Sequence, residues 1–137
     1  MPLDPVRFED TRNWLTKANK DLQSADHGLT ASPPLWEDVL FHCQQSVEKV
    51  LKGFLTHHDI SFRKTHSLEE IGEQCLKLDS SLNELINRAV PLTEYAWKFR
   101  YPGGWDEPTS QEVQQALQVA HELYDVILAR LPSEGRP

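Results

Sequence analysis

The chain has 137 residues, of which 39% are hydrophobic and 26% are charged, a composition typical of one globular domain that can bury its own core. The formal net charge of −7 argues against a wide electropositive surface for duplex DNA, and every apolar run is far shorter than the ~20 residues of a membrane-spanning helix. We therefore expect a single domain over residues 1–137 with no membrane association. Residues 1–5 lack the basic and apolar regions of a secretion signal, which favours a cytoplasmic location.

The first expected helix begins at Asp4 and Pro5, which have the residue types of an N-cap and a first helical position. Apolar residues then recur every three or four positions to about Gly28 or Leu29. Ser32 is the expected N-cap of a second helix, which runs to about His57. The apolar stripe of this second helix consists of Val39, Cys43, Val47, Val50, Leu51, Phe54 and Leu55.

Beside that stripe the second helix carries a polar file at spacings of three or four: His42, Gln45, Lys49 and Lys52. An apolar stripe indicates a core, whereas a polar file next to it indicates a site or an interface. His42 has the chemistry of a general base, although a hydrogen-bonded position between helices explains it equally simply.

The third and fourth helices are each predicted from a capping box. Ser67 and Glu70 have the spacing of a hydroxyl and a carboxylate that cap a third helix, and Ser81 and Glu84 repeat it for a fourth. Pro91 must kink or split the fourth helix, because proline removes a backbone donor. The residues expected to point inward are Leu68, Ile71, Cys75, Leu76, Leu82, Leu85, Ile86 and Ala89.

Thr109 is the expected N-cap of a fifth helix, and Pro132 ends it. A short frayed tail would follow at residues 132–137, which leaves a domain core of about residues 5–131. No segment shows the alternation of a half-buried strand. The sequence therefore predicts an all-α fold, an up-and-down bundle of four to five helices. Between the fourth and fifth helices lies a long loop, residues 98–108, of the kind that often carries function.

Four features together resemble the HEPN domain family over about residues 10–130. They are the pattern Phe-His-x-Gln-Gln-x-x-Glu-Lys-x-Leu-Lys from Phe41 to Lys52, the Thr-His-Ser-Leu at residues 65–68, the Arg-Tyr-Pro-Gly loop that starts at Arg100, and an alanine-rich last helix. The resemblance implies a helical bundle that usually forms a homodimer. It also implies a minimal nucleotidyltransferase as a protein partner, as in toxin–antitoxin-like pairs, and places this chain in a branch with the Arg-Tyr-Pro-Gly loop.

Ribonuclease members of the family have an arginine followed by histidine after four to six residues. Arg100 is the arginine in the comparable place, but the residues at that distance are Trp105, Asp106 and Glu107, and His121 lies too far along the chain. Neither tryptophan nor a surface carboxylate titrates near neutral pH as a general acid or base must. We therefore assign no catalytic residues, and metal-independent RNA cleavage with a degenerate motif remains the alternative hypothesis.

A binding role agrees better with the loop. Arg100 can bind a phosphate through two parallel N–H donors, Lys49 and Lys52 offer further positive charge, and Tyr101 and Trp105 offer faces for a base. The hypothesis is a nucleotide or RNA-phosphate site, or a partner-binding site, in one groove near the dimer axis. Its residues are Arg100, Tyr101, Lys49, Gln45, His42, Lys52 and Trp105.

Two alternatives remain at this point. Arg100 could simply tie the loop to carboxylates, with Gln45 and Lys49 in a dimer contact, or the protein could be a scaffolding dimer without a ligand. Cys43 and Cys75 fall on apolar helix faces, where thiols are inert. The histidines at positions 57, 58 and 66 do not have the spacing of a metal site. We therefore expect no metal and no cofactor.

Overall fold

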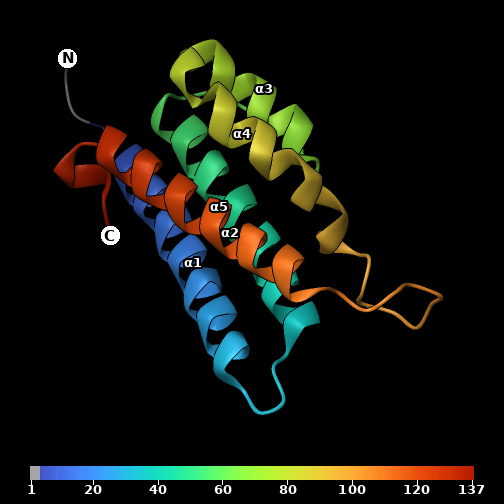
Figure 1. The fold of residues 1–137 in the computed structure, drawn as a ribbon. Helices are drawn as coiled ribbons and strands as arrows, with labels where there is room; N and C mark the ends of the chain where they lie inside the picture. The colour runs from blue at the N-terminus through green and yellow to red at the C-terminus, as the bar shows by residue number, and fades with distance from the viewer. Residues whose placement is uncertain (1–3) are drawn as a thin grey trace.

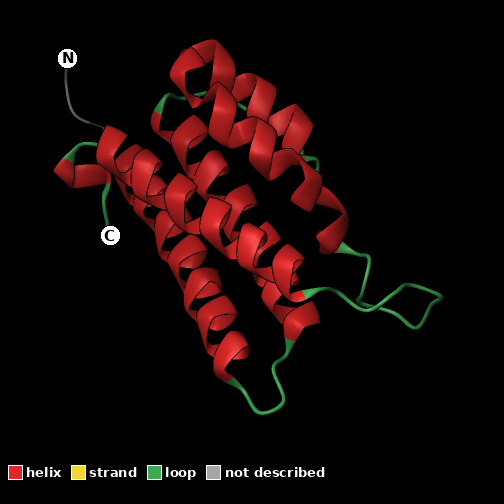
Figure 2. Cartoon of the chain, viewed as in Figure 1, coloured by secondary structure: helices red, strands yellow, loops and turns green. Residues whose placement is uncertain are grey.

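Five α-helices form the bundle that the computed structural model describes for residues 4–137 (Figure 1). The first three residues, part of the stretch considered for a secretion signal, lie outside the described part. Figure 2 shows helices and loops, with no strand in residues 4–137. The helices are α1 (Pro5–Thr30), α2 (Trp36–His57), α3 (Leu68–Leu78), α4 (Asn83–Ala89) and α5 (Ser110–Arg130). The predicted all-α helical bundle is confirmed.

Helix α2 is the central element. It pairs with α1 in a helical hairpin, α5 packs across this pair, and α3 packs on another side of α2 (Figure 1). Its predicted apolar stripe is buried in full, from Val39 to Leu55. Of the polar file, His42, Gln45 and Lys49 lie on a flank of α2 that stays partly open to solvent, whereas Lys52 is buried. None of the helices in residues 4–137 is long and apolar enough to cross a membrane.

Three predicted helix starts are confirmed by side-chain caps. The Asp4 carboxylate accepts a hydrogen bond from the backbone N–H of Arg7 at 3.2 Å, and Ser67 Oγ accepts one from Glu70 at 3.2 Å. Thr109 Oγ1 accepts from the N–H of Glu112 at 3.1 Å. Each bond satisfies a donor that the first helical turn would otherwise leave free.

Two predicted caps are wrong. Helix α2 begins after Leu35, which makes no side-chain capping bond. The Leu35 N–H donates a hydrogen bond to the Gly28 carbonyl at 3.0 Å, and this contact leaves Ser32 in the linker before the helix. Ser81 lies inside a 3₁₀ turn, Ser80–Leu82, that precedes α4, and Asp79 caps this turn by accepting from the Ser81 N–H at 3.0 Å. A carboxylate two residues earlier thus replaces the predicted hydroxyl.

The predicted split at Pro91 is confirmed, and the chain continues from Ala89 as a 3₁₀ helix, Val90–Ala96. The tail expected to be frayed is instead folded. Residues Ser133–Gly135 form a 3₁₀ turn that packs on α1, where Arg12 donates to the Glu134 carbonyl. Arg136 Nε donates to the Leu131 carbonyl at 2.9 Å, so the end of the chain covers buried Leu131.

Candidate ligand-binding site

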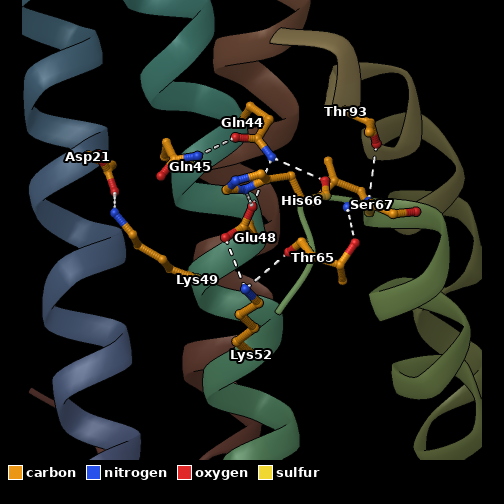
Figure 3. Close-up of polar contacts among 11 residues, drawn as sticks. Asp21, Gln44, Gln45, Glu48, Lys49, Lys52, Thr65, His66, Ser67 and Thr93 are labelled. Carbon is orange, nitrogen blue, oxygen red and sulfur yellow. Dashed lines mark hydrogen bonds and ion pairs between the residues drawn. The ribbon is translucent and has the colours of Figure 1, made fainter. Parts of the chain in front are cut away.

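Asp21 of α1 holds two members of the polar file. Its Oδ1 lies 2.8 Å from His42 Nδ1. Its Oδ2 accepts a hydrogen bond from Lys49 Nζ at 2.6 Å (Figure 3). The Asp21 residue is only 8% exposed, although it carries a carboxylate. Burial of an ionised group is costly unless the charge is paired, so this cluster ties α1 to α2 and neutralises the Lys49 charge.

Glu48 of α2 is the centre of a second cluster, shown in Figure 3. Its carboxylate accepts from Lys52 Nζ at 3.1 Å and from Gln44 Nε2 at 3.1 Å, and lies 2.7 Å from His66 Nδ1. Gln45 Nε2 donates to Gln44 Oε1 at 2.6 Å, which extends the cluster to the outer face of α2. Carboxylate, ammonium, amide and imidazole groups therefore form one connected polar network.

Lys52 is the most enclosed cation of the file. Its side chain is 8% exposed, and its ammonium also donates to the Thr65 carbonyl at 3.2 Å. The rings of Trp14 and Phe62 lie 5.7 Å and 5.6 Å from this nitrogen, within the range of a cation–π interaction. Lys52 thus fixes the segment before α3 against α2, and both hydrogen bonds that its ammonium makes go to protein groups.

Arg100 lies at the other end of the file. Its guanidinium carbon is 4.0 Å from the centre of the Phe41 ring, and its Nη1 is 3.9 Å from the Asp38 carboxylate. The side chain remains 45% exposed. Stacking on a ring leaves the N–H edges of a guanidinium available, because they lie in the plane of the group.

Around Arg100 the loop from Trp97 to Thr109 extends away from the bundle (Figure 1). Tyr101 is 78% exposed, and Trp97 and Trp105 are half exposed with ring centroids 5.8 Å apart. Lys98 Nζ lies 5.4 Å from the Trp105 ring and donates to Glu94 at 3.0 Å. The loop therefore presents several aromatic faces and a stacked arginine on one projecting segment.

The structure brings together part of the predicted site. Arg100, Tyr101 and Trp105 share the loop, and Phe41 links Arg100 to His42 through ring centroids 5.3 Å apart. Lys52 comes eleven residues after Phe41 in the same helix, which corresponds to about 16 Å along the axis. Gln45 and Lys49 lie between, bound to Gln44 and Asp21.

Several residues that contact the predicted site residues were not recognised from the sequence, among them Asp21 and Phe41. Asp21 lies beside the apolar face of α1. In the sequence, the signal for its role is a single acidic residue next to such a face. Phe41 belongs to the family-like pattern, but nothing in its own helix indicates that an arginine would stack on it.

The two thiols are buried as predicted, and burial raises the pKa of Cys43 and of Cys75 to about 12. Both therefore remain protonated and unreactive near neutral pH. Within residues 4–137, no three potential ligands among histidine, cysteine, aspartate and glutamate come together as they would around a metal ion.

The chain is thus an all-α bundle in which a long central helix has a polar flank and a projecting loop precedes the last helix. Comparison with family models gave a match to the HEPN domain over residues 11–131, and the chain therefore belongs to the HEPN domain family. Neither the curated proteins nor the solved structures compared with the chain gave a significant match.

Proposed function

We propose that the protein is a non-catalytic HEPN module that binds a phosphate-bearing ligand of the nucleotide or RNA class at the Arg100 loop. The observation that carries the proposal is the Arg100 guanidinium stacked 4.0 Å above the Phe41 ring. Its one ion-pair contact within residues 4–137 is long, 3.9 Å to Asp38. A positioned arginine with free donor edges suits the bidentate binding of a phosphate.

The neighbouring side chains supply the remaining chemistry. Tyr101, Trp97 and Trp105 are exposed rings on which a base can stack. His42 and Gln45 flank the Phe41 platform, whereas Lys49 and Lys52 contribute indirectly, because both ammonium groups are held by buried carboxylates. The binding site is therefore smaller than the sequence suggests and centres on the loop.

The proposal includes a homodimer and, as a protein partner, a minimal nucleotidyltransferase. Both follow from the family rather than from a contact in this structure. Size-exclusion chromatography with light scattering measures the first, and coelution after coexpression with such an enzyme measures the second. A monomer at all concentrations, or separate elution, would contradict the respective part.

One observation favours RNA cleavage as a second candidate function. The Asp21 carboxylate holds His42 by Nδ1 at 2.8 Å, an arrangement that orients an imidazole and leaves Nε2 for proton transfer. His42 lies at the Arg100 end of α2, so a histidine distant in sequence could replace the one that is absent after Arg100.

A thermal-shift titration tests the binding proposal. AMP, ATP and a short single-stranded RNA should each be added to the wild-type protein, to Arg100→Ala and to the matched control Arg63→Ala, whose exposed guanidinium pairs with Glu70. A ligand at a hundred times its Kd stabilises a protein by about 2.7 kcal/mol, which raises the Tm by several degrees. We expect this shift in the wild type and the control but not in Arg100→Ala.

The same RNA incubated with the protein in EDTA distinguishes the second candidate. Cleavage that His42→Ala abolishes would establish catalysis and overturn the non-catalytic function. If none of the probes shifts the Tm and the RNA stays intact, the ligand-free scaffold is the correct description.

A further inference from the structure

A pocket of about 280 Å³ opens where α2 begins and where the chain enters α5. The start of α2 and the end of the projecting loop lie side by side there (Figure 1). One wall is apolar and consists of Pro34, Leu35, Trp36 and Pro108. The other lining residues are acidic: Glu37, Asp38 and Glu107. This combination differs from the Arg100 surface, which offers a positive charge.

The apolar wall is unusual for the first turn of a helix. Leu35 occupies the N-cap position, where serine, aspartate and asparagine are preferred, and its side chain is 49% exposed. When a ligand covers an exposed leucine next to two prolines and a tryptophan, these apolar side chains lose no hydrogen bond to water. A chain of methylene groups would therefore find a favourable surface in this pocket.

The acidic residues of the pocket have few ion-pair partners. Glu37 and Glu107 form no ion pair within 4.0 Å in residues 4–137, and Asp38 has only the 3.9 Å contact to Arg100. The whole chain carries a net charge of −7, which adds a negative field. An anionic ligand would be repelled, whereas a cationic group would be attracted.

Lysine and arginine side chains combine the two required properties, since each has an aliphatic stem and a positive head group. We propose that this pocket receives a lysine or arginine side chain from a basic segment of a partner protein. The end of the bundle where α2 begins is then a protein-docking surface that adjoins the phosphate site, because Asp38 lines the pocket and also lies 3.9 Å from Arg100.

Fluorescence anisotropy at physiological salt tests this docking surface. The probe is a labelled peptide of alternating arginine and alanine whose termini are blocked and carry no charge. We expect binding by the wild type, and roughly tenfold weaker binding by Glu37→Gln/Glu107→Gln, because two carboxylates facing the cation are lost. The matched control is Glu73→Gln/Glu84→Gln, which changes the net charge equally on exposed residues of α3 and α4. Its affinity should equal that of the wild type.

Leu35→Ala keeps every charge and shortens the apolar wall, so it should weaken the same peptide about threefold. Absence of binding by the wild type, equal weakening by both charge variants, or equal binding of a glutamate–alanine peptide would overturn the docking surface. Glu37→Gln/Glu107→Gln should keep the nucleotide-induced Tm shift of the wild type. The two proposals can therefore fail independently.

Discussion

Lys52 and Arg100 are both cations that lie over aromatic rings, yet they differ in exposure and therefore in role. The Lys52 side chain is 8% exposed and its ammonium meets a carboxylate, a carbonyl and two rings. Arg100 has one ring and a distant carboxylate. A cation whose donors are all used inside the protein contributes to stability, whereas a cation with free donors can bind a ligand.

Replacing Lys52 should therefore damage the fold. In Lys52→Met the buried Glu48 carboxylate loses its ammonium partner, and breaking a buried pair from one side costs about 3–5 kcal/mol. Urea unfolding monitored by circular dichroism measures this loss. The exposed Lys20→Ala serves as the control and should change the free energy of unfolding by less than about 0.5 kcal/mol.

The double variant Glu48→Leu/Lys52→Met separates the pair from the remaining packing. Removal of both charges leaves no unpaired ion, so the double variant should regain much of the free energy of unfolding that Lys52→Met loses. It should not regain the part contributed by the contact between Glu48 and His66. A double variant as unstable as Lys52→Met alone would show that packing around the lysine stem, rather than the ion pair, maintains the structure.

The polar file itself was predictable, because its spacing is a local property of the α2 sequence. Its partners were not. Asp21 belongs to α1, which also carries Trp14, and the second ring that encloses Lys52, Phe62, comes from the segment between α2 and α3. Exposure decides between a structural and a binding role, and exposure depends on these tertiary neighbours.

At the scale of the elements, the helix caps show where local sequence suffices. Thr109 caps α5 through a bond that involves only residues three apart, so the pattern predicted it correctly. At Ser32 the same reasoning was wrong, because a contact between Leu35 and Gly28, made by the α1–α2 hairpin, sets where α2 starts. A cap pattern indicates a helix start reliably only when no neighbouring element competes for the backbone.

The two hydroxyls form a matched pair for a stability test. Thr109→Ala should lower the free energy of unfolding by about 1 kcal/mol, because a first-turn N–H of α5 loses its acceptor. Ser32→Ala should have almost no effect, since Ser32 caps no helix. Thermal or urea unfolding of the two variants checks this difference, and equal losses would contradict the observed start of α2.

Gly53 of α2 lies in tight contact with α1. A Cβ atom placed there would lie 2.5 Å from Leu15 Cδ2 and 3.1 Å from Trp14 Cβ. Gly53→Ala should improve helix propensity by about 1 kcal/mol and lose about 1–3 kcal/mol to overpacking, which leaves a net destabilisation. The control Gly104→Ala meets nothing within 4 Å. A Gly53→Ala variant more stable than the wild type would show that the helices separate easily.

At the scale of the whole molecule, the fold class and the order of the helices follow from the sequence, because hydrophobic periodicity marks the long helices α1, α2 and α5 and local capping patterns indicate the short helices α3 and α4. The position of the C-terminal residues could not be predicted from the sequence. Residues 132–137 are short and polar, and their docking on α1 depends on Arg12 and on the exposed carbonyl of Glu134. The partly open flank of α2 was likewise visible only after the other helices were in place.

The pH dependence of the free energy of unfolding should reflect two histidines at the end of α2, His57 and His58. Burial, and then repulsion from His58 and Arg7, lowers the pKa of His57, while burial and Arg7 lower the pKa of His58. The unfolded chain, with the ordinary value of 6.5, takes up these protons at a higher pH than the folded chain does. Their contribution to stability is therefore present above pH 6.5 and declines as the pH falls through that value.

Urea unfolding at several pH values between about 5.5 and 7.5 measures this slope. His57→Gln/His58→Gln should flatten it. A slope that persists in the double variant would assign the titration to other groups.

The contact between Arg100 and Phe41 also determines when the projecting loop loses its conformational entropy. Ordering a residue costs roughly 1–2 kcal/mol, and the stacked guanidinium tethers the loop to α2 before a ligand arrives. The loop is then preorganised, and a ligand does not have to offset that cost on binding. Phe41→Leu should consequently weaken the nucleotide-induced Tm shift although the guanidinium remains, so affinity at this site depends on a residue beneath the ligand-binding group.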